Sequence, residues 1–512
     1  MSKNRYPMLL ASLLATSFAC SVVATAPAQA LTGPATTGSN HTFTARLAIG
    51  DTERACSGVL VDAQWVLTAA SCFADDLNNP ATPAAGAPKK PTTAVIGRTD
   101  LTSTTGQIRK VVELVPRSDR DLLMARLDTP VTDITPVGVG AQAPSTGETL
   151  TSAGYGRTKD EWAPLRLHTG TFTADSVQGA ELNVTGKDGA SVCAGDTGGP
   201  VLREKNGQVE LVAVNSRSWQ AGCFGSDAAE TRTNAIDTRV DDMADWIAKN
   251  RLAALHKNIT NVVTSADFNT DGRPDVAAVL KDGNVHAFYT TPTGTLIYGR
   301  ELWKQDGSWK RKTRMFGGDF NGDGKADIAA LNTEGILTLY PGSSSGQLGN
   351  GIQMWKDASW GGFPHIARYR APGWARDGLV TVAPSGRLYA YPTGADGVLT
   401  GGRSEVWHDD TWNPKLISTS DYNSDKRNDI TAITQQGQLS LYTGNANGTF
   451  SYSNAMWPDA SWGGFPVILG GDFNNDGKAD LAAINSTGGL FLYPGDGNGK
   501  LSARSPMWPT TG

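Results

Sequence analysis

A motif that recurs about every 51 residues constrains the second half of the chain more than any other feature. Four segments share Asp, Asn, Asp and Asp at positions 1, 3, 5 and 9, and they begin at Asp267, Asp319, Asp421 and Asp472. Tryptophans recur with the same period at Trp303, Trp355, Trp407, Trp457 and Trp508. A period near 50 is typical of a propeller or array, so residues 259–512 are predicted to form five units. The third unit keeps the period but has Tyr369, Ala371 and Gly373 at positions 1, 3 and 5.

The four motifs have the ligand chemistry of calcium loops. A tight loop that turns its odd positions inward, with a carbonyl at position 7, supplies the six to eight oxygens that Ca²⁺ prefers, whereas Mg²⁺ keeps more of its water. Strand-like runs follow each motif, so an EF-hand is excluded. We expect about four structural Ca²⁺ sites and none in the third unit; Lys426 replaces the turn glycine of the fourth unit. The predicted ligand positions are Asp267, Asn269, Asp271, Arg273, Asp275, Asp319, Asn321, Asp323, Lys325, Asp327, Asp421, Asn423, Asp425, Arg427, Asp429, Asp472, Asn474, Asp476, Lys478 and Asp480.

These repeats resemble the FG-GAP/VCBS family, and the resemblance implies a β-propeller over 259–512, with five blades. The segment around Trp508 is expected to close the ring against the first unit. The recurring tryptophans have two interpretations, packing between blades or stacking on sugars or partner proteins. Their strict period favours packing.

Three local patterns mark the first half. They are WVLTAASC at 65–72, DLLMARL at 121–127 and CAGDTGGP at 193–200. In this order they resemble the chymotrypsin/trypsin-like serine proteases, whose segments read WVLTAAHC, DIALLRL and C-x-GDSGGP. The resemblance covers most of 31–250, implies an all-β double barrel, and includes both cysteine pairs, Cys56 with Cys72 and Cys193 with Cys223.

Two of the three triad positions depart from the family. Ser71 stands at the position of the histidine and Thr197 at that of the nucleophile, while Asp121 is kept. A serine hydroxyl has no basicity near neutral pH, and a threonine nucleophile needs a base. By the alignment, neither His41 nor His168 lies beside Ser71. The sequence therefore predicts a pseudoprotease.

Other parts of the protease apparatus persist. The backbone N–H groups of Gly195 and Thr197 match the family's oxyanion hole, and Ser191 with Val192 match the base of the substrate pocket. Ser218, Trp219 and Gln220 resemble the strand that pairs with a substrate backbone. Such a cleft either binds a peptide without cleaving it or is kept only as scaffold, and the sequence leaves both open.

The first thirty residues resemble a secretory signal. Lys3 and Arg5 precede an apolar stretch from Met8 to Val23, and Ala28-Gln29-Ala30 matches a signal-peptidase site. Removal would discard Cys20, and four remaining cysteines in an exported chain indicate two disulfides. Cleavage after Ala30 would also create an α-amino group at Leu31, which in the family's manner would pair with Asp196.

The sequence thus predicts a signal peptide at 1–30, a trypsin-like domain at 31–250 that ends in a helix, a linker at 251–258 and a propeller at 259–512. A formal net charge of −5 argues against nucleic-acid binding, and no later stretch is apolar enough to span a membrane. We expect a secreted, monomeric, non-catalytic protein that binds an extracellular protein, peptide or glycan. The alternatives are a secreted serine endopeptidase with weak or unusual activity and a structural surface protein.

Overall fold

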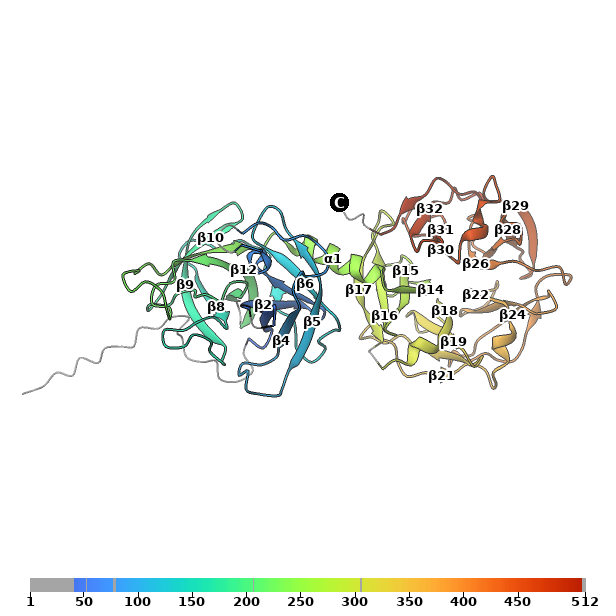
Figure 1. Cartoon of the computed structure of the whole chain (residues 1–512). Coiled ribbons are helices and arrows are strands. Elements are labelled where there is room, and N and C mark those ends of the chain that lie inside the picture. Colours follow the sequence, from blue (N-terminus) through green and yellow to red (C-terminus); the bar gives the residue numbers. More distant parts are fainter. Residues whose placement is uncertain (1–40, 52, 77–79, 206, 304–305, 509–512) are drawn as a thin grey trace, which may run out of the picture. The chain divides into compact units, whose positions relative to one another are not determined.

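The chain folds into two compact units, Met1–Ala244 and Asp245–Gly512. The structure is a computed structural model that describes residues 41–51, 53–76, 80–205, 207–303 and 306–508 (Figure 1). The described parts form a double β-barrel and a five-bladed β-propeller, which confirms the predicted all-β fold. The predicted signal peptide and Leu31 lie outside the described residues.

The first barrel is closed by six antiparallel strands in the order β1-β2-β3-β6-β5-β4. Burial alternates along β1 and β4, as period-2 patterning predicts, whereas β2, β3 and β6 are buried along most of their length. Leu47, Leu60 and Leu123 are fully buried inside the barrel. The elements are β1 (Thr44–Ile49), β2 (Arg54–Asp62), β3 (Trp65–Thr68), η1 (Ala70–Phe73), β4 (Thr92–Ile96), β5 (Gln107–Pro116) and β6 (Leu123–Leu127).

The second barrel closes through the order β11-β8-β9-β10-β13-β12, because β12 also pairs with β11, and β7 adds to β12 in parallel. Leu150, Phe172 and Val212 pack in its core. The strands are β7 (Gly138–Val139), β8 (Thr149–Gly154), β9 (His168–Gln178), β10 (Glu181–Gly186), β11 (Pro200–Lys205), β12 (Gln208–Ser218) and β13 (Asn234–Arg239).

Both predicted cysteine pairs are disulfides. Cys56–Cys72 joins β2 to η1, the short helix that carries Ser71. Cys193–Cys223 joins the segment before Thr197 to the loop after β12. Each disulfide therefore fixes a loop that carries residues of the candidate site.

The predicted linker is corrected by the structure. Helix α1 (Ala244–His256) begins later than the apolar pattern at 240–247 indicates and continues through most of 251–258. Leu252 is buried, and it packs in the propeller core with Val276 and Phe288. The polar composition of 251–258 indicated a linker because only a few residues of this helix are buried.

Each blade consists of four consecutive antiparallel strands. In Figure 1 the first strands of the blades, β14, β18, β22, β26 and β30, surround the centre of the propeller. The blades comprise β14 (Ile259–Ala266), β15 (Asp275–Leu280), β16 (Val285–Thr290) and β17 (Leu296–Trp303); β18 (Lys312–Gly318), β19 (Asp327–Asn332), β20 (Leu337–Tyr340) and β21 (Ile352–Gln353); β22 (His365–Tyr369), β23 (Gly378–Val382), β24 (Leu388–Tyr391) and β25 (Ser404–Glu405); β26 (Leu416–Ser420), β27 (Asp429–Ile433), β28 (Leu439–Gly444) and β29 (Phe450–Ala455); and β30 (Val467–Gly471), β31 (Asp480–Ile484), β32 (Leu490–Tyr493) and β33 (Ser505–Pro506).

Aromatic clusters pack at the junctions between consecutive blades. At four junctions a periodic tryptophan meets a second tryptophan, from the connection between blades, and a tyrosine from the third strand of the next blade, with ring centroids 4.5–6.2 Å apart. The clusters are Trp303, Trp309 and Tyr340; Trp355, Trp360 and Tyr391; Trp407, Trp412 and Tyr442; and Trp457, Trp462 and Tyr493. Each aromatic pair contributes about 0.5–1.5 kcal/mol beyond burial of its area, so the periodic tryptophans are packing residues, as the period indicated.

The ring closes between the last blade and the first, as predicted. The backbone N–H of Leu296 donates to the carbonyl of Met507 at 2.8 Å. Trp508 packs edge-on against Phe288 and stacks on His256 of α1, with centroids 5.0 and 4.5 Å apart. At this junction a histidine takes the place of the second tryptophan.

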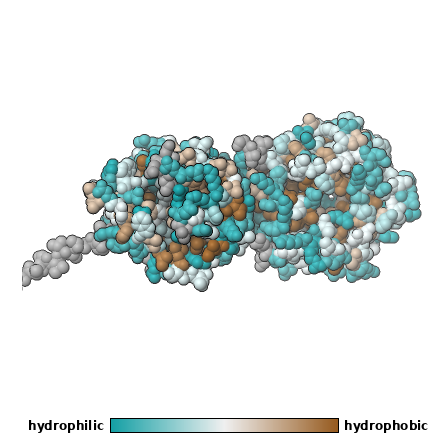
Figure 2. Space-filling view, in the orientation of Figure 1, coloured by the Kyte–Doolittle hydropathy of each residue, from teal (hydrophilic) through white to brown (hydrophobic). Residues whose placement is uncertain are grey.

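On the visible face of each unit, hydrophilic residues cover much of the surface, and smaller hydrophobic areas are scattered among them (Figure 2). None of the helices in the described ranges has the length and apolar character needed to cross a bilayer.

Candidate functional sites

Ser71 and Asp121 meet at the junction of the two barrels. Ser71 lies in η1, and its backbone N–H donates to Asp121 Oδ1 at 2.7 Å while its Oγ donates to Asp121 Oδ2 at 2.9 Å. The carboxylate therefore orients the side chain at position 71, as it would orient an imidazole. The group it holds is a hydroxyl, which carries no basic nitrogen.

Ser216 connects all parts of the degenerate triad and was not identified from the sequence. Its Oγ donates to Asp121 Oδ2 at 2.6 Å, and its carbonyl accepts a long hydrogen bond, 3.4 Å, from Thr197 Oγ1. The Thr197 hydroxyl is thus directed at a main-chain carbonyl. The sequence carried no signal for this role, since Ser216 lies between two motifs and acts only through the fold.

Gly195 and Thr197, the residues predicted to form the oxyanion hole, lie in a tight turn around Asp196. Gly195 has a φ of +102°, and a Cβ there would lie 2.8 Å from the Cα of Gly156, so the turn requires glycine. Within the part of the chain that the structure describes, neither amide N–H is used in a hydrogen bond. Both donors remain available to an incoming carbonyl or carboxylate.

Asp196 between them is fully buried. Its Oδ1 accepts the N–H of Gly156 at 2.7 Å and its Oδ2 accepts that of Cys193 at 2.9 Å. Burial raises the pKa of this carboxyl to about 7, and the two backbone hydrogen bonds oppose that shift. No cationic side chain in the described residues pairs with it. An α-amino group at Leu31 remains the predicted partner.

The residues predicted to form the substrate pocket lie in a buried segment and at the end of strand β12. Ser191 is buried, and its Oγ has no hydrogen-bond partner among the described residues. Val192 packs in the core of the second barrel, and its carbonyl accepts the hydroxyl of Ser218 at 2.5 Å. Strand β12 ends at Ser218, so Trp219 and Gln220 lie beyond it; Gln220 has a φ of 59°, which turns the chain away.

Trp162 and Phe224 form an exposed aromatic rim that was not identified from the sequence. Trp162 and Phe224, exposed by 59% and 41%, pack edge-on with centroids 6.2 Å apart. The Arg157 guanidinium lies 3.4 Å from the centre of the Trp162 ring, and the backbone N–H of Arg157 donates to the carbonyl of Ala194, next to Gly195. Trp219 is also exposed, by 38%. Exposed aromatics of this kind are enriched in protein and peptide interfaces.

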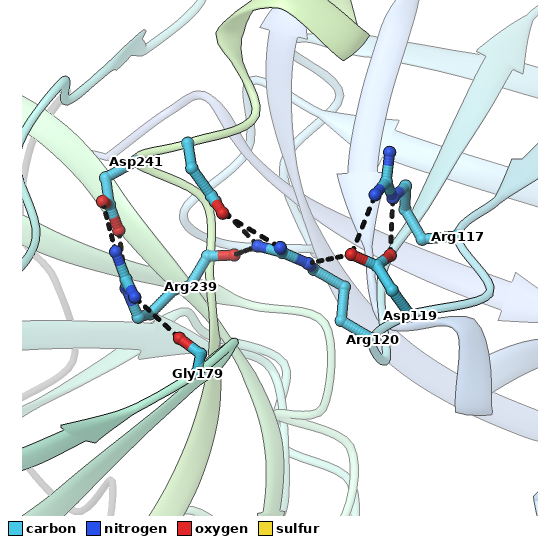
Figure 3. A network of polar contacts seen from close by, with 7 residues as sticks. Arg117, Asp119, Arg120, Gly179, Arg239 and Asp241 are labelled. Carbon is cyan, nitrogen blue, oxygen red and sulfur yellow. Dashed lines mark hydrogen bonds and ion pairs between the residues drawn. The ribbon is translucent and has the colours of Figure 1, made fainter.

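A network of charged residues supports the loop that carries Asp121 (Figure 3). The largely buried Arg120 donates to both oxygens of Asp242, at 2.7 and 2.9 Å, and to the carbonyl of Arg239. It also contacts Asp119, which pairs with Arg117. Residues before β6 are thereby joined to the segment after β13.

Replacing Arg120 tests this support. The hydrogen bond from Arg117, together with the charge of Arg120, holds the pKa of Asp119 at about 2, and the hydrogen bond from Arg120 lowers the pKa of Asp242. Carboxyls with depressed pKa values stabilise the fold above pH 4 and lose that contribution as the pH falls towards 2. Because both carboxylates are partly exposed, we expect Arg120→Met to cost about 1–2 kcal/mol at neutral pH.

The measurement is urea unfolding of the wild type and Arg120→Met between pH 7 and pH 2, with the exposed Arg217→Met as control. The difference should shrink as the pH approaches 2. A constant difference at all pH values would contradict the ionic role of Arg120.

In the propeller, the motif loops are organised by their own carboxylates. In the first loop Asp267 Oδ1 and Oδ2 accept the N–H groups of Asp271 and Gly272. Asp275, at position 9, accepts the N–H of Phe268 at 3.0 Å and that of Thr290 at 2.9 Å. The other three loops repeat the position-9 pattern with fully buried Asp327, Asp429 and Asp480.

These position-9 carboxyls are electrostatically unfavourable without a cation. Burial raises the pKa of Asp275 to about 7 and those of Asp327, Asp429 and Asp480 to about 6, and neighbouring loop carboxylates raise them further. Backbone hydrogen bonds offset part of the shift. The loops thus present oxygen donors and negative charge together, and this donor set fits a hard divalent cation.

Part of the charge is already compensated by side chains at position 7. Arg273 pairs with Asp271, Arg427 with Asp425, and Lys325 with Asp323 at 3.0 Å. Nowhere in the described ranges do three or more His, Cys, Asp or Glu side chains form a metal-binding group. A calcium site here would therefore also need the position-3 amide oxygen and the position-7 carbonyl.

The third unit, which lacks the motif, pairs its position-9 carboxylate with arginines. Its position-9 residue, Asp377, is buried and pairs with Arg370 Nε at 3.0 Å and more distantly with Arg368 Nη1 at 3.6 Å. It also accepts the N–H of Asp319 in the preceding blade at 2.9 Å. A guanidinium in this unit supplies the positive charge that the other four loops lack at position 9.

Comparison with known proteins agrees with this division of the chain. Residues 31–247 match the Trypsin family, and residues 267–330 and 421–483 match the FG-GAP-like repeat, which leaves out the third unit. The first region is 26% identical over 216 residues to snake venom serine proteinase 14 of Crotalus adamanteus, covering 38% of this chain and 76% of that protein. It is 28% identical over 209 residues to the thrombin-like enzyme leucurobin of Bothrops leucurus, covering 38% and 84%.

The double barrel with the Ser71–Asp121–Ser216 cluster thus defines a trypsin-like domain. The chain consists of a trypsin-family domain followed by FG-GAP-like repeats that form a β-propeller.

Proposed function

We propose that this protein is a secreted, non-catalytic trypsin-like protein that binds an extracellular protein, peptide or glycan, with a propeller stabilised by calcium. The observation that carries the proposal is the hydrogen bond from Ser71 Oγ to Asp121 Oδ2. Asp121 holds a hydroxyl where acyl transfer requires an imidazole to accept the nucleophile's proton. The Thr197 hydroxyl is directed at the Ser216 carbonyl, which is not a base that could activate a nucleophile.

A binding role is supported by what the cleft keeps. The N–H groups of Gly195 and Thr197 are available to an acceptor, and the rim of Trp162 and Phe224 offers exposed aromatic area, as does the separate Trp219. Two disulfides and similarity to venom proteases favour an extracellular location. Among the proposed partners, an extended peptide fits the free backbone donors best.

The second candidate function is a secreted endopeptidase of weak or unusual activity. It is favoured by the intact position of Asp121 and by the two free amide donors, since an oxyanion hole alone provides some rate acceleration.

A fluorophosphonate probe separates these two functions. We expect the full-length protein to remain unlabelled and to leave denatured protein substrates intact, while an active trypsin-like enzyme reacts under the same conditions. Labelling at Thr197, or steady cleavage that stops on Thr197→Ala, would contradict the non-catalytic proposal.

A further inference from the structure

The centre of the propeller contains a cavity of about 140 Å³. All five first strands of the blades contribute to its wall, and their ring surrounds the centre in Figure 1. A cavity needs only about 10–15 Å³ of such volume to hold one water molecule. The cavity therefore has room for a small organic molecule.

The charge of the wall is one-sided. Among the residues that line the cavity, Arg314 on β18 and Arg368 on β22 are cationic and none is acidic. Arg368 reaches Asp377 only at 3.6 Å, and that carboxylate is shared with Arg370, which lies closer at 3.0 Å. One carboxylate outside the cavity thus faces two guanidinium groups.

Arg314 is the more poorly compensated cation. Its Nη1 donates to the carbonyl of Pro364 at 2.9 Å, and the described part of the chain places no carboxylate against it. Burial lowers the pKa of Arg314, and the same guanidinium, together with burial, lowers the pKa of His365 nearby. A half-buried cation without a counter-ion is costly, and an anion in the cavity would remove that cost.

A hydroxyl donor is also available. Thr264 Oγ1, on β14, accepts the N–H of Gly317 at 2.6 Å, so its own proton can be donated to a ligand. A planar fork of N–H donors together with a hydroxyl suits a carboxylate, which accepts two parallel hydrogen bonds from a guanidinium.

We propose that the central cavity of the propeller binds a carboxylate through the guanidinium group of Arg314. This site is separate from the trypsin-like cleft and from the four motif loops. The carboxylate belongs either to a small free acid or to an acidic side chain of a partner.

Isothermal titration of the full-length protein, in buffer containing calcium, tests the proposal. The probes are succinate, its neutral analogue succinamide, and N-acetyl-aspartic acid amide as a mimic of an acidic side chain. We expect at least one of the two carboxylates to bind and succinamide not to bind. Preference for succinate indicates a free acid, and preference for the aspartate derivative indicates a side chain.

Arg314→Gln should weaken carboxylate binding at least tenfold. Arg314→Lys keeps the charge but loses the two parallel N–H donors, so its affinity should lie between those of Arg314→Gln and the wild type. The control is Lys356→Gln, which removes an exposed positive charge outside the cavity and should change affinity less than twofold. If Arg314→Gln does not fold, a weakened Arg314→Lys carries the test. No binding of either carboxylate, equal binding of succinamide, or unchanged affinity in the Arg314 variants would overturn the proposal.

Discussion

The double variant Ser71→His/Thr197→Ser should react with fluorophosphonates and hydrolyse peptide substrates at least ~10³-fold faster than the wild type. An imidazole on η1 would meet Asp121, which already receives hydrogen bonds from the backbone and side chain of residue 71. A serine hydroxyl at 197 would then have a base to take its proton. The disulfide between Cys56 and Cys72 holds the helix that carries the new histidine.

The single variants are the controls. Because triad members act as a unit, Ser71→His and Thr197→Ser alone should each stay near the wild-type rate. Adding Asp121→Asn to the double variant should return its rate to near the wild-type level, because the imidazole would take the wrong tautomer. If the double variant folds but stays inert, the loss of activity extends beyond the triad, and the buried Val192 and the turn at Gln220 become the places to examine.

Removal of calcium should lower the stability of the propeller much more than that of the trypsin-like domain. At a free calcium concentration 100 times its Kd, one site contributes about 2.7 kcal/mol, and four sites would make the calorimetric transition of the propeller strongly dependent on calcium. The physical reason is the buried carboxyl at position 9 of each loop, whose pKa is raised where no divalent cation compensates it.

Differential scanning calorimetry with calcium and with excess EDTA measures the effect. Asp472→Asn should reduce it, since the amide keeps a hydrogen-bond acceptor for the loop but loses a charged metal ligand. Asp410→Asn removes an exposed carboxylate outside the loops and is the matched control. An unchanged transition in EDTA, or equal stabilisation by Mg²⁺, would contradict a structural calcium role.

The candidate site was only partly predictable. The motifs located Ser71, Asp121 and Thr197, because each lies within a run of residues whose spacing is distinctive. The role of Ser216 was not predictable, since it depends on β12 bringing a hydroxyl to Asp121 across 95 residues of sequence. The aromatic rim was missed for the same reason: exposure of Trp162 and Phe224 is a property of the folded surface.

The sequence alone determined the two-part all-β architecture, the cysteine pairs, the five-unit ring and the packing role of the periodic tryptophans. The double barrel and the cysteine pairs follow from the resemblance that the local motifs carry, and the five units follow from the period. Both signals lie in the order of residues along the chain. Only the tertiary structure decided that residues 251–256 continue a helix onto the propeller core, that Arg370 neutralises Asp377 in the unit without the motif, and that Arg314 stands without a carboxylate at the centre. Each of these is set by neighbours distant in sequence, because burial and charge pairing exist only once the blades have closed into a ring.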